Sequence, residues 1–213
     1  MYKLFFKRPF DLIFSLLIIV LISPLFLLTA LILSIYYRGN PFFTQSRPGL
    51  LGKPFNLIKF KSMINKYDVK NELLPDEQRI TSVGKFIRKT SIDEMPQLFN
   101  ILMGDMSFIG PRPLLLSYME YYTDREHCRH SVRPGISGLA QVSGRNNIEL
   151  PQRLKLDVKY VENISFINDF KILLKTVKNV IHGKDITVVT PSTTLKDYRG
   201  KNPKWKGMRT LEY

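Results

Sequence analysis

LIFSLLIIVLISPLFLLTALILSIYY, residues 12–37, is almost wholly apolar and carries no charged side chain. At about 1.5 Å per residue, a helix of this length would reach roughly 39 Å, which is enough to span a bilayer. The run is too long for the apolar part of a signal peptide and lacks a small-x-small cleavage site, so we exclude that interpretation. The sequence therefore predicts a membrane helix within residues 1–40.

The middle of this run is Ser23-Pro24. Proline removes one helical hydrogen bond and predicts a kink, while the neighbouring serine can bond back to the freed carbonyl. A straight spanning helix with a mild kink and a bent helix that re-enters the same leaflet both fit this pattern. Basic residues flank both ends, and the positive-inside rule then favours the cytoplasmic side for both. These residues are Lys3, Lys7 and Arg8 before the run, and Arg38, Arg47, Lys53, Lys59 and Lys61 after it.

The composition favours anionic partners. The 213 residues carry 32 basic and 18 acidic side chains, a net charge of +14, which suits nucleic acid, anionic lipid or phosphorylated substrates. Hydrophobic residues make up 44% of the chain, enough for a folded core. The single cysteine, Cys128, excludes an internal disulfide and a cysteine-rich metal site.

Further along, TSIDEMPQ at residues 90–97 places two carboxylates, Asp93 and Glu94, side by side. Ser91 and Glu94 have the spacing of a capping box, and Pro96 indicates that Asp93 lies in the first turn of a helix. A helix start favours anions, so phosphate can bind beside these carboxylates. The alternative is that they only cap the helix. The apolar face predicted for this helix consists of Ile92, Met95, Phe99 and Leu102.

Three basic residues are candidates for binding phosphate near these carboxylates. Arg112 lies between two prolines, which restrict its backbone and suit a guanidinium that binds phosphate bidentately. Lys59 lies on a predicted strand over residues 55–61 and could face either phosphate or water. Arg88 precedes the Asp93 turn, where it could orient the carboxylate, bind a second phosphate or remain a surface side chain.

A glycine-rich stretch at residues 132–146 is the second candidate region for an anion. Its glycines allow the backbone to approach a ligand closely. Arg133 and Arg145 bracket the stretch, and Gln141 can hydrogen-bond a base or a sugar. It matches neither a Walker nor a dinucleotide-binding motif.

The C-terminal part begins with two predicted helices, over residues 150–166 and 167–182. The second is amphipathic, with lysines on its polar side, and either lies on an anionic membrane or packs against the core. Gly183 should end it. Residues 184–213 are basic and lack apolar periodicity, so we expect a loosely ordered tail.

Several motifs follow one another in a characteristic order. They are the apolar segment with Ser23-Pro24, FTQSRPG at 43–49, KFKSM at 59–63, SIDEMPQLFN at 91–100, GDMSFIGPRP at 104–113 and RPGISG at 133–138. From Lys7-Arg8 to about Gly183, this order resembles the small monotopic phosphoglycosyl transferases of the bacterial sugar transferase family.

The resemblance implies an α/β fold that is mainly helical with a short sheet. A re-entrant membrane helix (1–40), broken at Ser23 and Pro24, would precede a cytosolic catalytic domain (41–183) with interfacial amphipathic helices and a basic C-terminal tail (184–213). The expected location is the bacterial inner (cytoplasmic) membrane, with the catalytic domain on the cytoplasmic face and membrane lipids as partners.

The implied reaction transfers a phosphosugar from a UDP-sugar to polyprenyl (undecaprenyl) phosphate and releases UMP, as the first membrane step of glycoconjugate assembly. Asp93 would be the nucleophile that forms a covalent phosphosugar intermediate, with Glu94 as its partner. The family requires Mg²⁺, which Asp93 and Glu94 would hold. The expected substrate-binding residues are Lys59, Arg88, Arg112, Arg133, Gln141 and Arg145.

Two other functions are compatible with parts of this pattern. A glycosyltransferase that moves only the sugar and releases UDP would usually carry an Asp-x-Asp metal motif, which the sequence lacks. A non-catalytic basic protein that binds a membrane surface or nucleic acid would use Asp93 and Glu94 only as caps. We expect no nucleic-acid partner, and the sequence indicates neither the sugar nor the oligomeric state.

Overall fold

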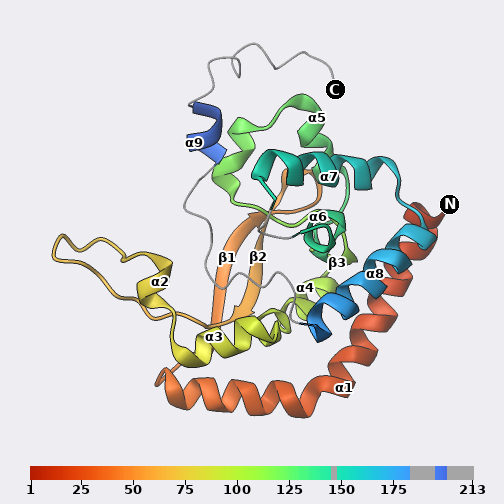
Figure 1. Cartoon of the computed structure of the whole chain (residues 1–213). Coiled ribbons are helices and arrows are strands. Elements are labelled where there is room, and N and C mark those ends of the chain that lie inside the picture. Colours follow the sequence, from red (N-terminus) through yellow and green to blue (C-terminus); the bar gives the residue numbers. More distant parts are fainter. Residues whose placement is uncertain (145–147, 183–194, 201–213) are drawn as a thin grey trace.

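The structure, a computed structural model, describes residues 1–144, 148–182 and 195–200 (Figure 1). Its helices are α1 (Lys7–Tyr36), α2 (Asp76–Arg79), α3 (Ser82–Lys89), α4 (Gln97–Met103), α5 (Asp124–His127), α6 (Leu139–Val142), α7 (Leu150–Glu162), α8 (Phe166–Ile181) and α9 (Leu195–Gly200). Its strands are β1 (Phe42–Pro48), β2 (Pro54–Phe60), β3 (Ser107–Ile109) and β4 (Gly135–Ser137). The described part is mostly helical with little sheet, as predicted.

Helix α1 contains Pro24 within its length and is visibly bent (Figure 1). Pro24 has no N–H to donate to the carbonyl of Val20, four residues earlier. The Ser23 hydroxyl donates to that carbonyl instead, at 2.8 Å. The predicted back-bond is confirmed, and it allows the helix to pass through proline without an unsatisfied carbonyl.

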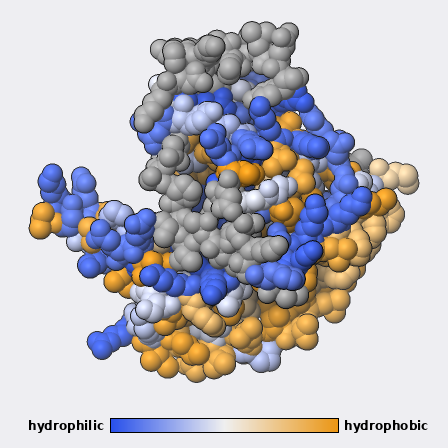
Figure 2. Space-filling model, viewed as in Figure 1, coloured by the Kyte–Doolittle hydropathy of each residue, from blue (hydrophilic) through white to orange (hydrophobic). Residues whose placement is uncertain are grey.

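Most of the surface of α1 is apolar and uncovered. It is the one described helix long and apolar enough to cross a membrane, with a mean hydropathy of 3.0 over its most apolar window, of which 11% is buried. Figure 2 shows this apolar surface along the underside of the molecule, below the hydrophilic side chains of the rest. The side of α1 that is covered packs on α4 and on the end of β2.

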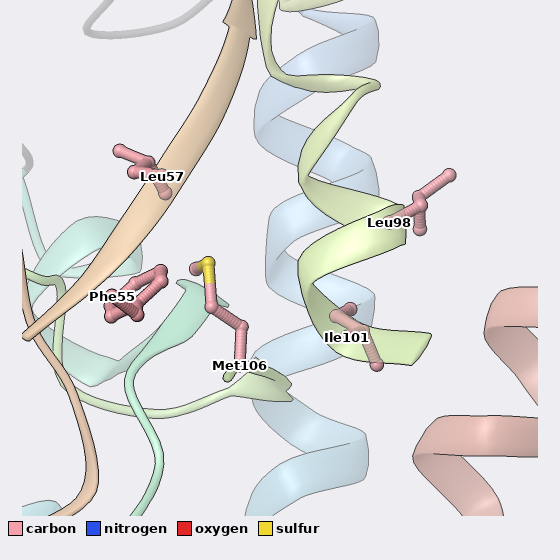
Figure 3. Close-up of a cluster of buried hydrophobic side chains, with 5 residues drawn as sticks. All are labelled: Phe55, Leu57, Leu98, Ile101 and Met106. Atoms are coloured by element: carbon pink, nitrogen blue, oxygen red, sulfur yellow. The ribbon is translucent and has the colours of Figure 1, made fainter. Parts of the chain in front are cut away.

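Strands β1 and β2 form an antiparallel hairpin, with Phe42 opposite Phe60 and Arg47 opposite Phe55, and β2 confirms the strand predicted over residues 55–61. Phe55 and Leu57 of β2 pack against Leu98 and Ile101 of α4 and against Met106 (Figure 3). Phe60 belongs to a second cluster with Leu33 of α1 and Ile87 of α3. The hairpin is therefore fixed between α1, α3 and α4.

The segment around Asp93 differs from the predicted capped helix. Residues Ile92–Glu94 form a separate 3₁₀ turn, and α4 begins only at Gln97, after the buried Pro96. No capping box forms, because Ser91 adopts a left-handed backbone (φ 59°) and its side chain caps nothing. The predicted apolar face is also wrong in part, since α4 buries Leu98 and Ile101 while Phe99 is exposed.

Strands β3 and β4 form a separate two-stranded parallel sheet, with Ser107 opposite Gly135. Gly110 and Gly135 permit this pairing, because a Cβ on Gly110 would lie 2.5 Å from the carbonyl oxygen of Arg133. Helices α6, α7 and α8 pack around this sheet. Two small sheets therefore replace the single short sheet expected from the sequence.

Helix α8 is joined to the start of the chain by a buried carboxylate, Asp169. Tyr2 and Tyr160 donate hydrogen bonds to it, each at 2.8 Å, and Lys7 forms an ion pair with it. Phe166 contacts the rings of Tyr2 and Phe10. The N-terminal half of α1 and the start of α8 therefore lie side by side, as Figure 1 shows.

The tail is not uniformly loose. Residues 195–200 form α9, in which Leu195 is fully buried and Arg199 pairs with the buried Glu126 at 2.6 Å. The expectation of a loosely ordered tail is wrong for this helix. The other tail residues, 184–194 and 201–213, lie outside the described residues, and so does Gly183, which the sequence predicts to end α8.

Candidate active site

Four segments meet at the carboxylates of Asp93 and Glu94. The Glu94 Oε1 atom accepts from Lys59 Nζ, on β2, and from Arg112 Nη2, in the loop after β3, each at 2.9 Å. Lys59 Nζ also lies 3.9 Å from Asp93 Oδ2. Arg88, on α3, is close enough for its charge to lower the pKa of Asp93. The structure thus brings together three of the predicted cations around the predicted carboxylate pair.

The two carboxylates have different electrostatic environments. Burial, followed by the neighbouring charge of Glu94, raises the pKa of Asp93 to about 6. Burial would also raise the pKa of Glu94, but the charges of Lys59 and Arg112 outweigh it and hold that pKa well below its ordinary value. Glu94 is therefore the permanently ionised partner. Asp93 is 7% exposed and makes no side-chain hydrogen bond within the described residues, so its oxygens are available to a ligand.

The backbone conformation of Ser91 helps to orient the carboxylates of Asp93 and Glu94. Ser91 is a non-glycine residue in the left-handed region, a conformation that costs on the order of 1 kcal/mol and clusters at functional sites. It separates α3 from the 3₁₀ turn that carries Asp93 and Glu94, and this turn packs beside β2. The strained turn explains why the predicted helix cap does not form, although the two carboxylates still lie beside the predicted cations.

Lys59 is positioned by Asn100, a fully buried residue of α4. The Asn100 side chain accepts from the Ile58 N–H at 3.0 Å and donates to the Asn56 carbonyl at 2.8 Å. These two bonds fix β2 against α4 beside the carboxylates. Lys59, which from the sequence could face either phosphate or water, consequently points towards the carboxylates.

Arg112 is positioned by a buried ion pair that joins distant segments. Arg129 Nη2 donates to the Arg112 carbonyl at 2.6 Å and to Asp157 Oδ2, on α7, at 2.7 Å. Arg129 Nη1 donates to the Tyr122 hydroxyl at 2.9 Å. Because Arg129 is 2% exposed, this anchor holds the Pro-Arg-Pro backbone rigidly.

Arg88 reaches the site because α3 packs very closely on the segment after β2. Its Nε donates to the Ser62 hydroxyl at 2.9 Å. Gly84 makes this approach possible, since a Cβ there would lie 1.8 Å from the Ser62 carbonyl oxygen.

The remaining predicted substrate-binding residues do not join this group. Arg133 Nε donates at 2.7 Å to the carbonyl of Gly104, at the opposite end of α4 from Asp93. Gln141 lies in α6, where its Nε2 donates to the Ile136 carbonyl at 3.5 Å. Arg145 lies outside the described residues. Ser23 and Pro24 are in the middle of α1, as predicted.

The carboxylate pair suits Mg²⁺ better than a metal that needs a full set of protein ligands. The described residues contain no group of three or more His, Cys, Asp or Glu that could hold a metal ion. Mg²⁺ commonly uses one or two carboxylates and completes its shell with water and substrate phosphate. Asp93, whose pKa is raised and whose oxygens lack hydrogen-bond partners among the described residues, fits such a ligand.

Asn100 and Arg129 were not among the predicted site residues. Asn100 lies within a family motif quoted above, but nothing in the motif distinguishes a positioning amide from a surface one. Arg129 had no sequence signal as a positioning residue, because its partner Asp157 is 28 residues away. Both act through the residues that they hold in place.

The chain is similar to known proteins along most of its length. Residues 2–183 match the family model described as bacterial sugar transferase. An uncharacterized sugar transferase, EpsL, of Bacillus subtilis (strain 168) is 48% identical, over 84% of this chain and 89% of the relative. An undecaprenyl-phosphate galactose phosphotransferase of Salmonella typhimurium is 41% identical, over 83% of this chain and 40% of the relative.

A third relative is the UDP-glucose:undecaprenyl-phosphate glucose-1-phosphate transferase of Caulobacter vibrioides, which is 39% identical over 82% of this chain and 69% of the relative. The chain thus spans less than half of the Salmonella relative but most of the Bacillus one. The family match covers nearly all the residues that build the carboxylate site. The chain therefore belongs to the bacterial sugar transferase family, and it is a phosphoglycosyl transferase, as its motifs predict.

Proposed function

We propose that this enzyme transfers a phosphosugar from a UDP-sugar to undecaprenyl phosphate, releases UMP, and forms a covalent aspartyl-phosphosugar intermediate at Asp93. The names of the Salmonella and Caulobacter relatives support the acceptor and the class of reaction. The observation that carries the mechanism is the contrast between two adjacent carboxylates, one bound by two cations and the other buried with its oxygens available.

In the first step, an Asp93 oxygen attacks the β-phosphorus of the donor. A carboxylate O–P bond forms, the bond from the β-phosphorus to the bridging oxygen breaks, and the electron pair leaves with the phosphate of UMP. In the second step, a phosphate oxygen of the lipid acceptor attacks the same phosphorus and restores the carboxylate. Carboxylates are established covalent nucleophiles of this kind.

The surrounding cations allow an anionic nucleophile to approach an anionic substrate. Lys59, Arg88 and Arg112 lie around the carboxylates before substrate arrives, so little reorganisation is needed when charge develops. Glu94 holds Lys59 and Arg112 in place. Arg133 is left out of this assignment because its guanidinium caps the far end of α4.

Asp93 and Glu94 would also hold Mg²⁺, which when bound neutralises charge on the phosphate oxygens. The pair cannot complete a metal site alone. The affinity for Mg²⁺ should therefore rise when the nucleotide sugar contributes its own phosphate oxygens.

We further propose that α1 enters and leaves the same leaflet and that the catalytic domain lies on the cytoplasmic face of the bacterial inner membrane. The bend at Ser23 and Pro24, with basic residues before and after it, supports this topology. It would place the carboxylates at headgroup depth, where a water-soluble donor and a lipid phosphate can both reach them.

Intact-protein mass spectrometry with UDP-sugars and Mg²⁺, without lipid acceptor, tests the mechanism. The wild-type protein should gain the mass of one phosphosugar and release UMP, and Asp93→Asn should do neither. Asp124→Asn, an exposed carboxylate, is the matched control and should react normally. Release of UDP only after the acceptor is added, with no adduct, would reject the mechanism in favour of a sugar-only glycosyltransferase.

Cysteine labelling tests the topology. In a Cys128→Ser background, Lys3→Cys and Asn40→Cys mark the two ends of the apolar segment. A re-entrant helix places both thiols on the cytoplasmic side, whereas a spanning helix would expose one of them to an impermeant reagent from outside.

A further inference from the structure

A cavity of about 190 Å³ lies between α6, α7 and α8, and the reaction described above gives it no role. Its apolar lining belongs to the cluster that packs these helices on β3 and β4. This lining consists of Leu139, Val142, Tyr160 and Ile172. The exposed side chains around it include three lysines, which are Lys159, Lys171 and Lys175. The cavity therefore combines an apolar interior with a cationic edge.

The three lysines come from two helices that a short, hydrogen-bonded corner holds together. Lys159 lies in the last turn of α7, and Lys171 and Lys175 lie one turn apart on α8. The Asn163 Nδ2 atom donates to the Lys159 carbonyl at 2.9 Å, and the Asn168 Nδ2 atom donates to the Asn163 carbonyl at 2.6 Å. These bonds fix the two backbones that carry the lysines, so the cationic edge exists before any ligand binds.

The helices around the cavity offer these lysines no counter-charge. Every carboxylate of α7 and α8 is paired with another cation, and α6 carries no carboxylate. The pairs are Asp157 with Arg129, Glu162 with Arg125, and Asp169 with Lys7. Within the described residues, the three lysines make no ion pair. Unpaired positive charge beside an apolar lining fits an anionic amphiphile, because the ammonium groups attract the charge while the lining and the lysine stems contact carbon chains.

The cavity borders the exposed apolar side of α8. Lys171 and Lys175 directly follow Phe170 and Leu174, which are exposed, so each lysine lies about 100° around the helix from an apolar side chain. One turn before Phe170, the start of α8 contacts the apolar helix α1 through an aromatic ring (Figure 1). A lipid that lies along this side of α8 therefore has its headgroup within reach of the lysines.

The size of the cavity favours a headgroup over a complete nucleotide sugar. Pockets that enclose drug-sized ligands measure roughly 300–1,000 Å³, whereas this cavity measures about 190 Å³. We propose that it binds the phosphate headgroup of an anionic bilayer phospholipid, whose acyl chains lie along the apolar side of α8. The inference rests on the membrane location proposed above and not on the covalent mechanism.

The bound phospholipid is a structural partner of the catalytic domain and not a substrate. Within the described residues, no side chain that lines the cavity bonds to Asp93, Glu94 or the cations around them. The lipid instead bridges α7 and α8 through the three lysines. It thereby selects membranes that contain anionic phospholipid.

Native mass spectrometry of the full-length protein in a nonionic detergent tests the proposal, with phosphatidylglycerol and phosphatidylcholine of identical acyl chains as probes. The wild-type protein should bind the first phosphatidylglycerol about 10-fold or more tightly than the first phosphatidylcholine, since each lysine near an anionic lipid contributes roughly a factor of five. Lys171→Gln/Lys175→Gln should weaken phosphatidylglycerol binding up to about 30-fold and leave phosphatidylcholine binding unchanged. Lys66→Gln/Lys178→Gln is the matched control, because it removes the same charge from exposed positions outside the cavity.

Several results would overturn the proposal. Equal affinity of the wild-type protein for the two lipids, or equal weakening in the two double variants, would show that the cavity selects no headgroup. Displacement of phosphatidylglycerol by glycerol 3-phosphate at the same concentration would assign the cavity to soluble phosphates. A raised KM for undecaprenyl phosphate in Lys171→Gln/Lys175→Gln, with unchanged phosphatidylglycerol binding, would assign the lysines to the acceptor.

The adduct assay separates this proposal from the proposed mechanism. A wild-type protein that selects phosphatidylglycerol but forms no phosphosugar adduct would reject the covalent mechanism alone. Normal adduct formation without any selectivity between the two lipids would reject the lipid site alone.

Discussion

Glu94 connects the site through a single oxygen atom. Its Oε1 accepts from Lys59 and Arg112, which come from segments on either side of it in the sequence. Both bonds are charge-assisted and partly shielded from water, so each is stronger than an exposed ion pair. Glu94 therefore maintains the geometry in which the cations face Asp93.

Replacing Glu94 with glutamine should release Lys59 and Arg112 while keeping the size of the side chain. We expect the single-turnover rate of UMP release to fall about 100-fold or more, by analogy with the loss of one preorganised electrostatic contact. Rapid-quench measurement of UMP release checks this, with the exposed Glu72→Gln as control. A rate within a few-fold of wild type would show that the two cations hold their positions without Glu94.

His130 should make the stability of the fold depend on pH. Burial, then the charges of Arg129 and His127, lowers the pKa of His130 from its ordinary 6.5 to about 4. Between these values the unfolded chain binds a proton that the folded chain does not, so this contribution to stability is lost as the pH falls from 6.5 to about 4. The Tm of wild type should drop more steeply over this range than that of His130→Gln. Parallel curves for the two proteins would contradict the assignment.

Among the elements, the contact between β2 and α4 matters most to the site. The fully buried Asn100 side chain bonds one N–H and one carbonyl of β2, those of Ile58 and Asn56. The apolar cluster drawn in Figure 3 surrounds the same contact. The contact between β2 and α4 therefore contributes both to the position of Lys59 and to the stability of the fold.

Asn100→Ala should destabilise the protein by roughly 2–4 kcal/mol, because it removes a fully buried side chain and its hydrogen bonds to Ile58, Asn56 and Asp105. Chemical denaturation in detergent measures this change, and Asn65→Ala, in an exposed loop, provides the comparison. The adduct yield at saturating donor should fall as well, since Lys59 loses its fixed position. A stability loss without any change in adduct formation would show that Lys59 is held by Glu94 alone.

Elements governed by local pattern were predicted well, and those governed by distant partners were not. The apolar run, the strand over residues 55–61 and the amphipathic α8 have patterns that a single segment displays. The capping box is absent because Ser91 adopts a left-handed backbone, and Glu94 instead bonds Lys59 and Arg112, whose positions no local spacing reveals. The contacts of Arg129 with Asp157 and of Arg133 with Gly104 likewise depend on how the whole chain folds.

Across the whole molecule, the exposed apolar faces of α1 and α8 are adjacent. Phe166 of α8 contacts Phe10 of α1, and the apolar side of α8 continues from there with Phe170, Leu173, Leu174 and Val177, all exposed. We propose that this side of α8 lies in the membrane interface beside α1. The lysines of α8 would then face the headgroups.

Replacing Phe170 and Leu174 together with serine should separate the two half-reactions. Both side chains are about half exposed, so the fold should tolerate the change. The favourable free energy of burying the two side chains in lipid, up to about 3–6 kcal/mol, is lost. We expect transfer to undecaprenyl phosphate in vesicles to fall about 10-fold and UMP release from the soluble donor to persist. Lys178→Gln controls for the polar side of α8. An equal loss in both half-reactions would indicate a folding defect instead.

The bonds to Asp169 also impose an order of assembly during synthesis. Lys7 and Tyr2 precede Asp169 by 162 and 167 residues. At about 5–20 residues per second, the ribosome makes α1 roughly 10–30 s before α8 exists. In the proposed topology, the apolar helix therefore waits in the bilayer for its catalytic domain, and the fold closes at the membrane surface.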